Sequence, residues 1–231
     1  MPFPANKSHN FSGNYYECLA KVTLGHIFPD RYNNLIKSER PDFISDDGSI
    51  GVEVTRAVHP LDAEKDAFFS KHLLKKNAKE IDKNRILSFC SDGTRLLLYG
   101  KIGGVPTDKI IGCSYGMDRE GVDLITDAIE KKYKLLNEGG YQNCSSLELY
   151  VLVHNGGYYE EYEIDQIFWN TLSIAEVYER IFDIVYIDAW DDFYVLDMIN
   201  KTMTKTDKND SLATIKKTAI EMAEILESRD I

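Results

Sequence analysis

The sequence predicts a mixed α/β fold in which a central sheet is flanked by helices. Segments with apolar residues at helical spacing alternate along the chain with short apolar strands that end at turn residues. The chain has 231 residues, of which 43% are hydrophobic and 28% charged, so it can bury a substantial core. We therefore expect one domain covering residues 1–231.

The first half of the chain predicts a helix, a hairpin and a second helix. Apolar residues at helical spacing favour a helix over 12–28, and Pro29 marks its end. Apolar runs at 43–45 and 50–58 flank the tetrapeptide DDGS, in which the D-G pair is a strong hairpin signal because glycine accepts positive φ without steric cost. Beyond Pro60, a lysine-rich helix is expected over 62–84.

The second half of the chain predicts further strands and helices. The almost continuously apolar run LYVLV within 147–154 indicates the central strand of the sheet. In chain order we expect a strand at 95–99, a helix at 118–138 that ends at Gly139-Gly140, the central strand at 147–154, a helix at 172–181, strands at 184–187 and 193–196, a polar loop at 200–210 and a C-terminal helix at about 211–228.

Composition limits the function classes. A net charge of -11 counts against a protein that coats nucleic acid, although it leaves room for a local basic surface. No apolar run approaches the roughly 20 residues that span a bilayer, and no h-region of a secretory signal is visible. The four cysteines are scattered, with no C-x-x-C pair. We expect a cytoplasmic protein with no membrane partner.

The stretch PDFISDDGSIGVEVTRA, residues 41–57, carries the main candidate site. Side chains alternate along a strand, so the aliphatic residues of the second arm share one face while Glu53 and Thr55 share the other. One interpretation is an ordinary hairpin whose polar pair faces solvent. The other is a metal site, because Asp42 and Glu53 can lie side by side across the hairpin, and Mg²⁺ is bound through a small number of carboxylates.

The residues PDF and GVEVT resemble the signature of the PD-(D/E)XK nuclease superfamily, which has the restriction-endonuclease-like fold. This resemblance implies that Asp42 and Glu53 bind Mg²⁺ or Mn²⁺, with the carbonyl of Val54 as a third ligand. It also implies that an acidic residue of the first helix, here Glu17, assists. The motif covers residues 41–55, and the order of helix, hairpin, helix and strand extends the similarity to about 1–155.

The sequence departs from that signature at Thr55, which occupies the position of the family's lysine. A hydroxyl can hydrogen-bond water or phosphate, but it carries no positive charge. Some members of the superfamily place the lysine on the helix after the hairpin, where this chain has lysines at a spacing of four. Lys71, Lys75 and Lys79 are therefore candidates to reach the metal or to bind nucleic acid, and a solvated helix face is the alternative.

We expect a Mg²⁺-dependent nuclease that acts on DNA or, second, on RNA. Two alternatives remain open. One is a module of the same fold that lost catalysis when threonine replaced lysine and that only binds or regulates. The other is an unrelated α/β interaction protein whose acidic surface recognises a basic partner. A homodimer would suit an enzyme that cuts both strands of DNA.

Overall fold

The computed structural model describes residues 13–72, 84, 95–98, 101–102, 105–106, 110–114, 121–153, 159–208 and 211–229. The chain divides into two compact units. One comprises residues 1–12 and 59–119, and the other comprises 13–58 and 120–231. A compact unit need not fold independently, so the single domain expected from the length stays a prediction.

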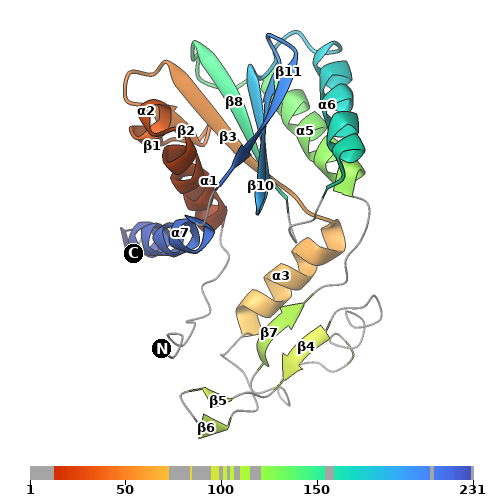
Figure 1. Ribbon diagram of the computed structural model, residues 1–231. Coiled ribbons are helices and arrows are strands. Elements are labelled where there is room, and N and C mark those ends of the chain that lie inside the picture. The colour runs from red at the N-terminus through yellow and green to blue at the C-terminus, as the bar shows by residue number, and fades with distance from the viewer. Residues whose placement is uncertain are drawn as a thin grey trace. The chain divides into compact units, whose positions relative to one another are not determined.

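The larger unit contains a seven-stranded mixed sheet and its helices (Figure 1). Its elements in chain order are α1 (Gly13–Ile27), α2 (Pro29–Tyr32), β1 (Leu35–Lys37), β2 (Phe43–Ser45), β3 (Ile50–Ala57), α5 (Gly121–Glu138), β8 (Ser146–Val153), α6 (Glu161–Ala175), β9 (Ile184–Ala189), β10 (Asp192–Asp197), β11 (Thr202–Asp207) and α7 (Leu212–Arg229). The α/β class expected from the sequence is confirmed.

The strand order of this sheet is β1-β2-β3-β8-β9-β10-β11. The central pairs β3–β8 and β8–β9 are parallel, and the remaining pairs are antiparallel. Parallel neighbours need a crossover connection, and α5 and α6 are the helices that precede β8 and β9. The centre of the sheet is covered by α5 and α6 on one face and by α1 and α7 on the other, which explains why β8 is apolar almost throughout.

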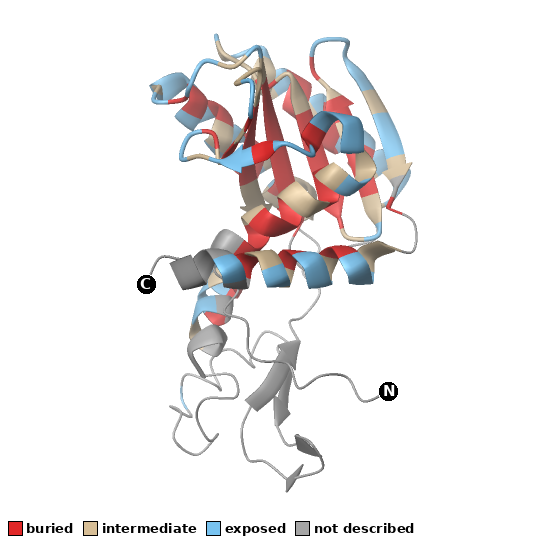
Figure 2. Ribbon diagram, turned by 90° about the vertical axis from the view of Figure 1, so that its left-hand side faces the viewer, coloured by how far each residue is buried: buried red, intermediate tan, exposed pale blue. Residues whose placement is uncertain are grey.

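Each face of the sheet has its own core (Figures 1 and 2). Helices α5 and α6 cover one face, where Leu149 and Val151 of β8 point. Helices α1 and α7 pack together on the other face, where Val52 and Val54 of β3 point. Because successive residues of β3 point to opposite faces, Glu53 is directed toward the layer of α5.

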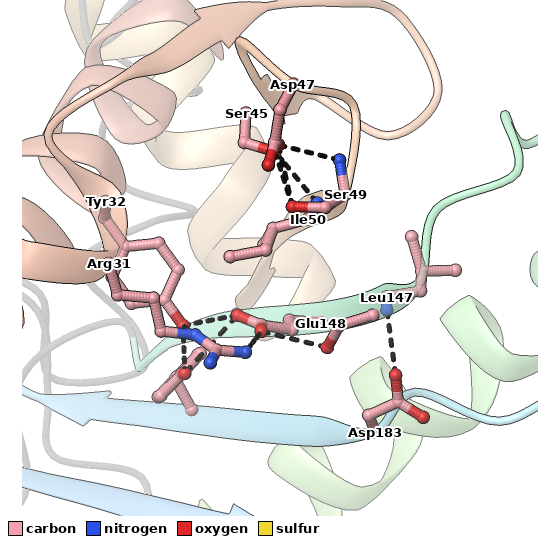
Figure 3. Close-up of polar contacts among 11 residues, drawn as sticks. Arg31, Tyr32, Ser45, Asp47, Ser49, Ile50, Leu147, Glu148 and Asp183 are labelled. Atoms are coloured by element: carbon pink, nitrogen blue, oxygen red, sulfur yellow. Dashed lines mark hydrogen bonds and ion pairs between the residues drawn. The ribbon is translucent and has the colours of Figure 1, made fainter.

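A buried polar network fixes α2 to the face covered by α1 (Figure 3). Glu148 of β8 has no exposed surface, and its carboxylate accepts hydrogen bonds from Arg31, Tyr32 and Ser146. A hydrogen bond also joins the Tyr32 and Tyr186 hydroxyls. A carboxylate without solvent is stable only when its oxygens are paired, so this network is part of the structural core.

The smaller unit contains α3 (Pro60–His72) and the short strands β4 (Arg95–Leu98), β5 (Lys101–Ile102), β6 (Val105–Pro106) and β7 (Ile110–Ser114). Strand β4 pairs with β7, and β5 pairs with β6. Helix α3 corresponds to the first part of the helix expected at 62–84, and residues 73–83 lie outside the described residues.

Two sequence predictions in the larger unit were wrong. The helix expected at 172–181 is α6, which lies at Glu161–Ala175, and the region expected to be a polar loop contains β11. Strand β11 pairs only with β10 at the edge of the sheet, so its polar residues meet solvent and carry little apolar signal. The C-terminal helix expected at about 211–228 is α7.

Candidate active site

The β2–β3 hairpin brings Asp42 and Glu53 together. Asp42 directly precedes β2, and its Oδ2 accepts a hydrogen bond of 2.7 Å from the backbone N–H of Val54. This contact anchors the Asp42 side chain beside the residue that follows Glu53. The predicted proximity of the two carboxylates is thus a feature of the folded hairpin, although Glu53 is only 5% exposed and does not face solvent.

The close packing behind Asp42 depends on a glycine. Pro41 lies against Gly51 of β3, where an added Cβ would come within 2.6 Å of Pro41 Cγ and 2.8 Å of Cys144 Sγ. Real Cβ atoms do not approach other atoms so closely. Gly51 therefore lets the Pro41-Asp42 segment rest directly on the sheet.

A lysine reaches this site from α5. The Nζ of Lys132 lies 2.5 Å from Oε1 of Glu53, and both side chains are mostly buried, at 19% and 6% exposure. Lys132 follows the buried residues Ala128 and Ile129 at the i+4 and i+3 positions, which places it on the sheet-facing side of the helix. An ammonium thus lies beside Glu53, on the helix that precedes β8.

The Glu53 carboxylate is buried between Lys132 and Tyr141. Burial, the negative charge of Glu53 and a hydrogen bond to the Glu53 carboxylate together raise the pKa of Tyr141. The Oε2 atom of Glu53 has no hydrogen bond of standard geometry to the described residues. A buried carboxylate oxygen that is poorly hydrogen-bonded is costly, and a bound cation would reduce that cost.

Glu17 and Lys37 complete the site on the other side of Asp42. Glu17, on α1, forms an ion pair with Lys37 of β1, and Lys37 Nζ lies 4.0 Å from Asp42 Oδ1. The site therefore holds three carboxylates, with Lys132 beside Glu53 and Lys37 beside Glu17 and Asp42.

The acidic side chains act on one another electrostatically. Burial raises the pKa of Asp42 to about 6, and the negative charges of Glu53 and Glu17 add to this effect. The hydrogen bond from Val54 and the charge of Lys132 oppose the increase. A carboxyl group with this pKa loses its proton easily near neutral pH, especially when a divalent cation competes for the same oxygen.

The remaining expected site residues are Thr55 and three lysines. Thr55 is half-buried and lies on the same strand face as Glu53. Lys71 belongs to α3 in the smaller unit, but its side chain lies outside the described part of the chain. Lys75 and Lys79 also lie outside the described residues. Among the described residues, the lysine paired with Glu53 is Lys132.

The sequence prediction missed Lys132, Lys37 and Tyr141. Lys132 left a signal, since it interrupts an apolar stripe of α5 at a position where a buried residue is expected; the stripe is Ile125, Ala128, Ile129, Tyr133 and Leu136. Lys37 had no comparable signal, because β1 is a strand of three residues at the sheet edge and was not expected.

No family model, curated protein or solved structure matches the chain. Among the described residues, no group of three or more His, Cys, Asp and Glu side chains has the arrangement of a metal site. Within the same residues, no helix has the length and apolar character needed to cross a membrane.

Proposed function

We propose that this protein is a metal-dependent nuclease of the PD-(D/E)XK type that hydrolyses phosphodiester bonds in DNA. The observation that carries the proposal is the pairing of Lys132 with Glu53 beside Asp42. It combines two carboxylates and a lysine, the three groups of the signature, although the lysine comes from a different element. The order of α1, the β2–β3 hairpin, α5 and β8 supports a restriction-endonuclease-like fold.

Asp42 and Glu53 would hold Mg²⁺ or Mn²⁺. The buried Oε2 of Glu53, which has no hydrogen bond of standard geometry to the described residues, suits a hard cation, and Mg²⁺ uses one or two carboxylates while keeping waters for its other positions. When bound, such an ion supplies positive charge to the phosphate and lowers the pKa of a coordinated water. The carbonyl of Val54 is the third ligand that the resemblance implies, and Glu17 is the acidic residue of the first helix that assists.

The chain's own residues then have separate roles. The Lys132 ammonium lies where it can stabilise negative charge that develops on the scissile phosphate. Glu17 orients the attacking water, and the Thr55 hydroxyl donates or accepts a hydrogen bond at the family's lysine position. Burial of Glu53 and Lys132 strengthens these electrostatic contacts because it excludes screening solvent.

The alternative of an inactive binding module rested on the loss of the lysine. Lys132 supports retained catalysis, because it returns an ammonium to the carboxylate pair. A homodimer, in which each subunit cuts one strand, and a cytoplasmic location stay predictions.

Cleavage of plasmid and linear DNA with Mg²⁺ or Mn²⁺ tests the proposal. We expect Asp42→Ala and Glu53→Ala to abolish cleavage while the circular dichroism spectrum stays that of the folded protein. Glu176→Ala is the matched control, since its side chain is 71% exposed and lies outside the site. Cleavage by either site variant at the wild-type rate would refute the assignment.

A further inference from the structure

Lys37 is a second cation at the site, and the two-carboxylate signature does not include it. Its Nζ is paired with Glu17, lies 4.0 Å from Asp42 Oδ1 and lies 5.4 Å from the centre of the Phe43 ring. The side chain is 39% exposed. The proposed function gives both of these carboxylates other roles, since Asp42 would hold the ion and Glu17 would orient the attacking water.

Ion binding would change the surroundings of Lys37 specifically. Oδ2 of Asp42 accepts the hydrogen bond from Val54, so Oδ1 is the oxygen that faces Lys37. Once Asp42 binds a divalent ion and Glu17 hydrogen-bonds to the water on that ion, the attraction of both carboxylates for the Lys37 ammonium becomes weaker. A divalent cation near the same oxygens also repels an ammonium at a few ångströms.

We propose that Lys37 is a phosphate-binding residue for DNA, and that it becomes available when Asp42 and Glu17 engage the ion. This inference rests on the proposed function. Phe43 and the short strand β1 hold the aliphatic stem of Lys37 beside the site, while its four-carbon chain allows the ammonium to turn outward.

Lys37 and Lys132 therefore differ in role. Lys132 is 19% exposed and paired with the buried Glu53, so it remains within the site. Lys37 is about twice as exposed and paired with the less buried Glu17, which is 20% exposed. Lys132 acts on the reacting phosphate, and Lys37 binds a phosphate of the DNA backbone next to it.

Such an arrangement couples the two ligands. The ion raises DNA affinity because it frees an ammonium for the DNA, and DNA in turn raises affinity for the ion by the same factor. Without the ion, Lys37 neutralises the acidic side chains and contributes nothing to DNA binding. The ion also attracts the phosphate directly, so substitution of Lys37 removes only the part of the coupling that this ammonium carries.

Fluorescence anisotropy with a labelled, cleavage-resistant phosphorothioate DNA duplex tests this coupling with and without Mn²⁺. We expect Mn²⁺ to raise the DNA affinity of the wild-type protein, and Lys37→Met to lower the affinity in Mn²⁺ roughly tenfold, as expected for one charge-assisted contact. The slope of log affinity against log salt should fall by about 0.9, the value for one lost phosphate contact. Lys37→Arg should restore most of the affinity.

The matched control is Lys201→Met, which removes the same charge from an exposed lysine paired with Glu176 at 3.6 Å. It should bind DNA like the wild type. Calorimetry should show that Lys37→Met binds Mn²⁺ at least as tightly as the wild type, since the variant lacks a competing cation.

One result overturns the role of Lys37 while leaving the nuclease function intact, namely wild-type DNA affinity in Lys37→Met with Mn²⁺ present. If that variant also cleaved faster at low Mn²⁺, Lys37 would be only a competitor of the ion. If the wild-type protein neither binds Mn²⁺ nor cleaves DNA, the proposed function fails, and the role of Lys37 fails with it.

Discussion

Lys132 is the residue whose replacement tests the proposed cleavage chemistry separately from DNA binding. Lys132→Met keeps most of the aliphatic stem but removes the ammonium beside Glu53. We expect kcat for DNA cleavage to fall about 10²-fold or more with KM little changed, because the charge acts mainly on the transition state. Steady-state kinetics on a labelled duplex measures both constants.

Lys131→Met is the control for that variant, because Lys131 is exposed on the same helix and carries the same charge. Thermal unfolding shows whether either variant is folded. A Lys132→Met protein that is folded and has the wild-type kcat would remove Lys132 from the mechanism.

Asp42 makes the stability of the ion-free protein depend on pH. Its pKa is about 6 in the folded protein against an ordinary value of 3.8, so between these values the folded protein binds more protons than the unfolded chain. The contribution of Asp42 to the free energy of unfolding therefore rises as pH falls from above 6 toward 4. Above pH 6 the charged carboxylate is a cost, caused first by burial and then by Glu53.

Asp42→Asn removes this titration while keeping an oxygen that can accept the hydrogen bond from Val54. In chelator at pH 7.5 we expect the variant to be more stable than the wild type by roughly 1 to 3 kcal/mol, given about 1.4 kcal/mol per pKa unit. The difference should narrow toward pH 4. Urea unfolding across this range measures it, and a difference independent of pH would contradict the pKa shift.

At the scale of elements, the hairpin that holds Asp42 depends on the close contact between Pro41 and Gly51. Gly51→Ala would place a Cβ within 2.6 Å of Pro41 Cγ and 2.8 Å of Cys144 Sγ. We expect a loss of about 1 to 3 kcal/mol in the free energy of unfolding, because neighbouring groups must shift. A shift of Pro41 also moves Asp42, so Mn²⁺ affinity should fall.

Gly25→Ala is the matched control, since its nearest neighbour would be 3.8 Å away and it lies within α1. Alanine is the better helix former, so this variant should be as stable as the wild type or up to about 1 kcal/mol more stable. Chemical unfolding compares the two variants. Equal stability of Gly51→Ala and the wild type would show that the hairpin does not need the glycine.

The elements of the sheet differ in how well the sequence predicted them. Strands β2, β3 and β8 were expected because they combine apolar runs with a turn signal or with burial on both faces. Strands β1 and β11 are the two edges of the sheet and contain few buried residues, so no pattern identified them.

The residues of the candidate site also differ in how well the sequence predicted their positions. Asp42 and Glu53 are joined by a local hairpin, and their proximity was predictable from the turn between them. Lys132 lies 79 positions from Glu53, and only the packing of α5 on the sheet brings them together. The sequence indicated a helix there, but single-sequence patterns contain no information on which distant strand a helix contacts.

At the scale of the whole molecule, net charge constrains the proposed function. A chain with a net charge of -11 repels DNA as a whole, so the proposed function requires attraction from a bound ion and a few lysines near the site. If the proposal is right, DNA binding will depend on both the ion and the salt concentration.

Ion binding should stabilise the folded protein as a whole, because Asp42 and Glu53 come together only in the folded hairpin. An ion at a hundredfold its dissociation constant adds about 2.7 kcal/mol to the free energy of unfolding. For a chain of this size that corresponds to a rise in Tm of roughly 5 to 10 °C. Differential scanning fluorimetry with Mn²⁺ or with chelator measures the rise.

Glu53→Gln should lose this rise, because the neutral amide has a single oxygen and no negative charge for the ion. Glu176→Gln changes the same group at a site 71% exposed and should keep the full rise. If Mn²⁺ stabilised all three proteins equally, the ion would bind elsewhere. If it stabilised none of them, Asp42 and Glu53 would not form a metal site, and the buried pair of Glu53 and Lys132 would be a structural ion pair.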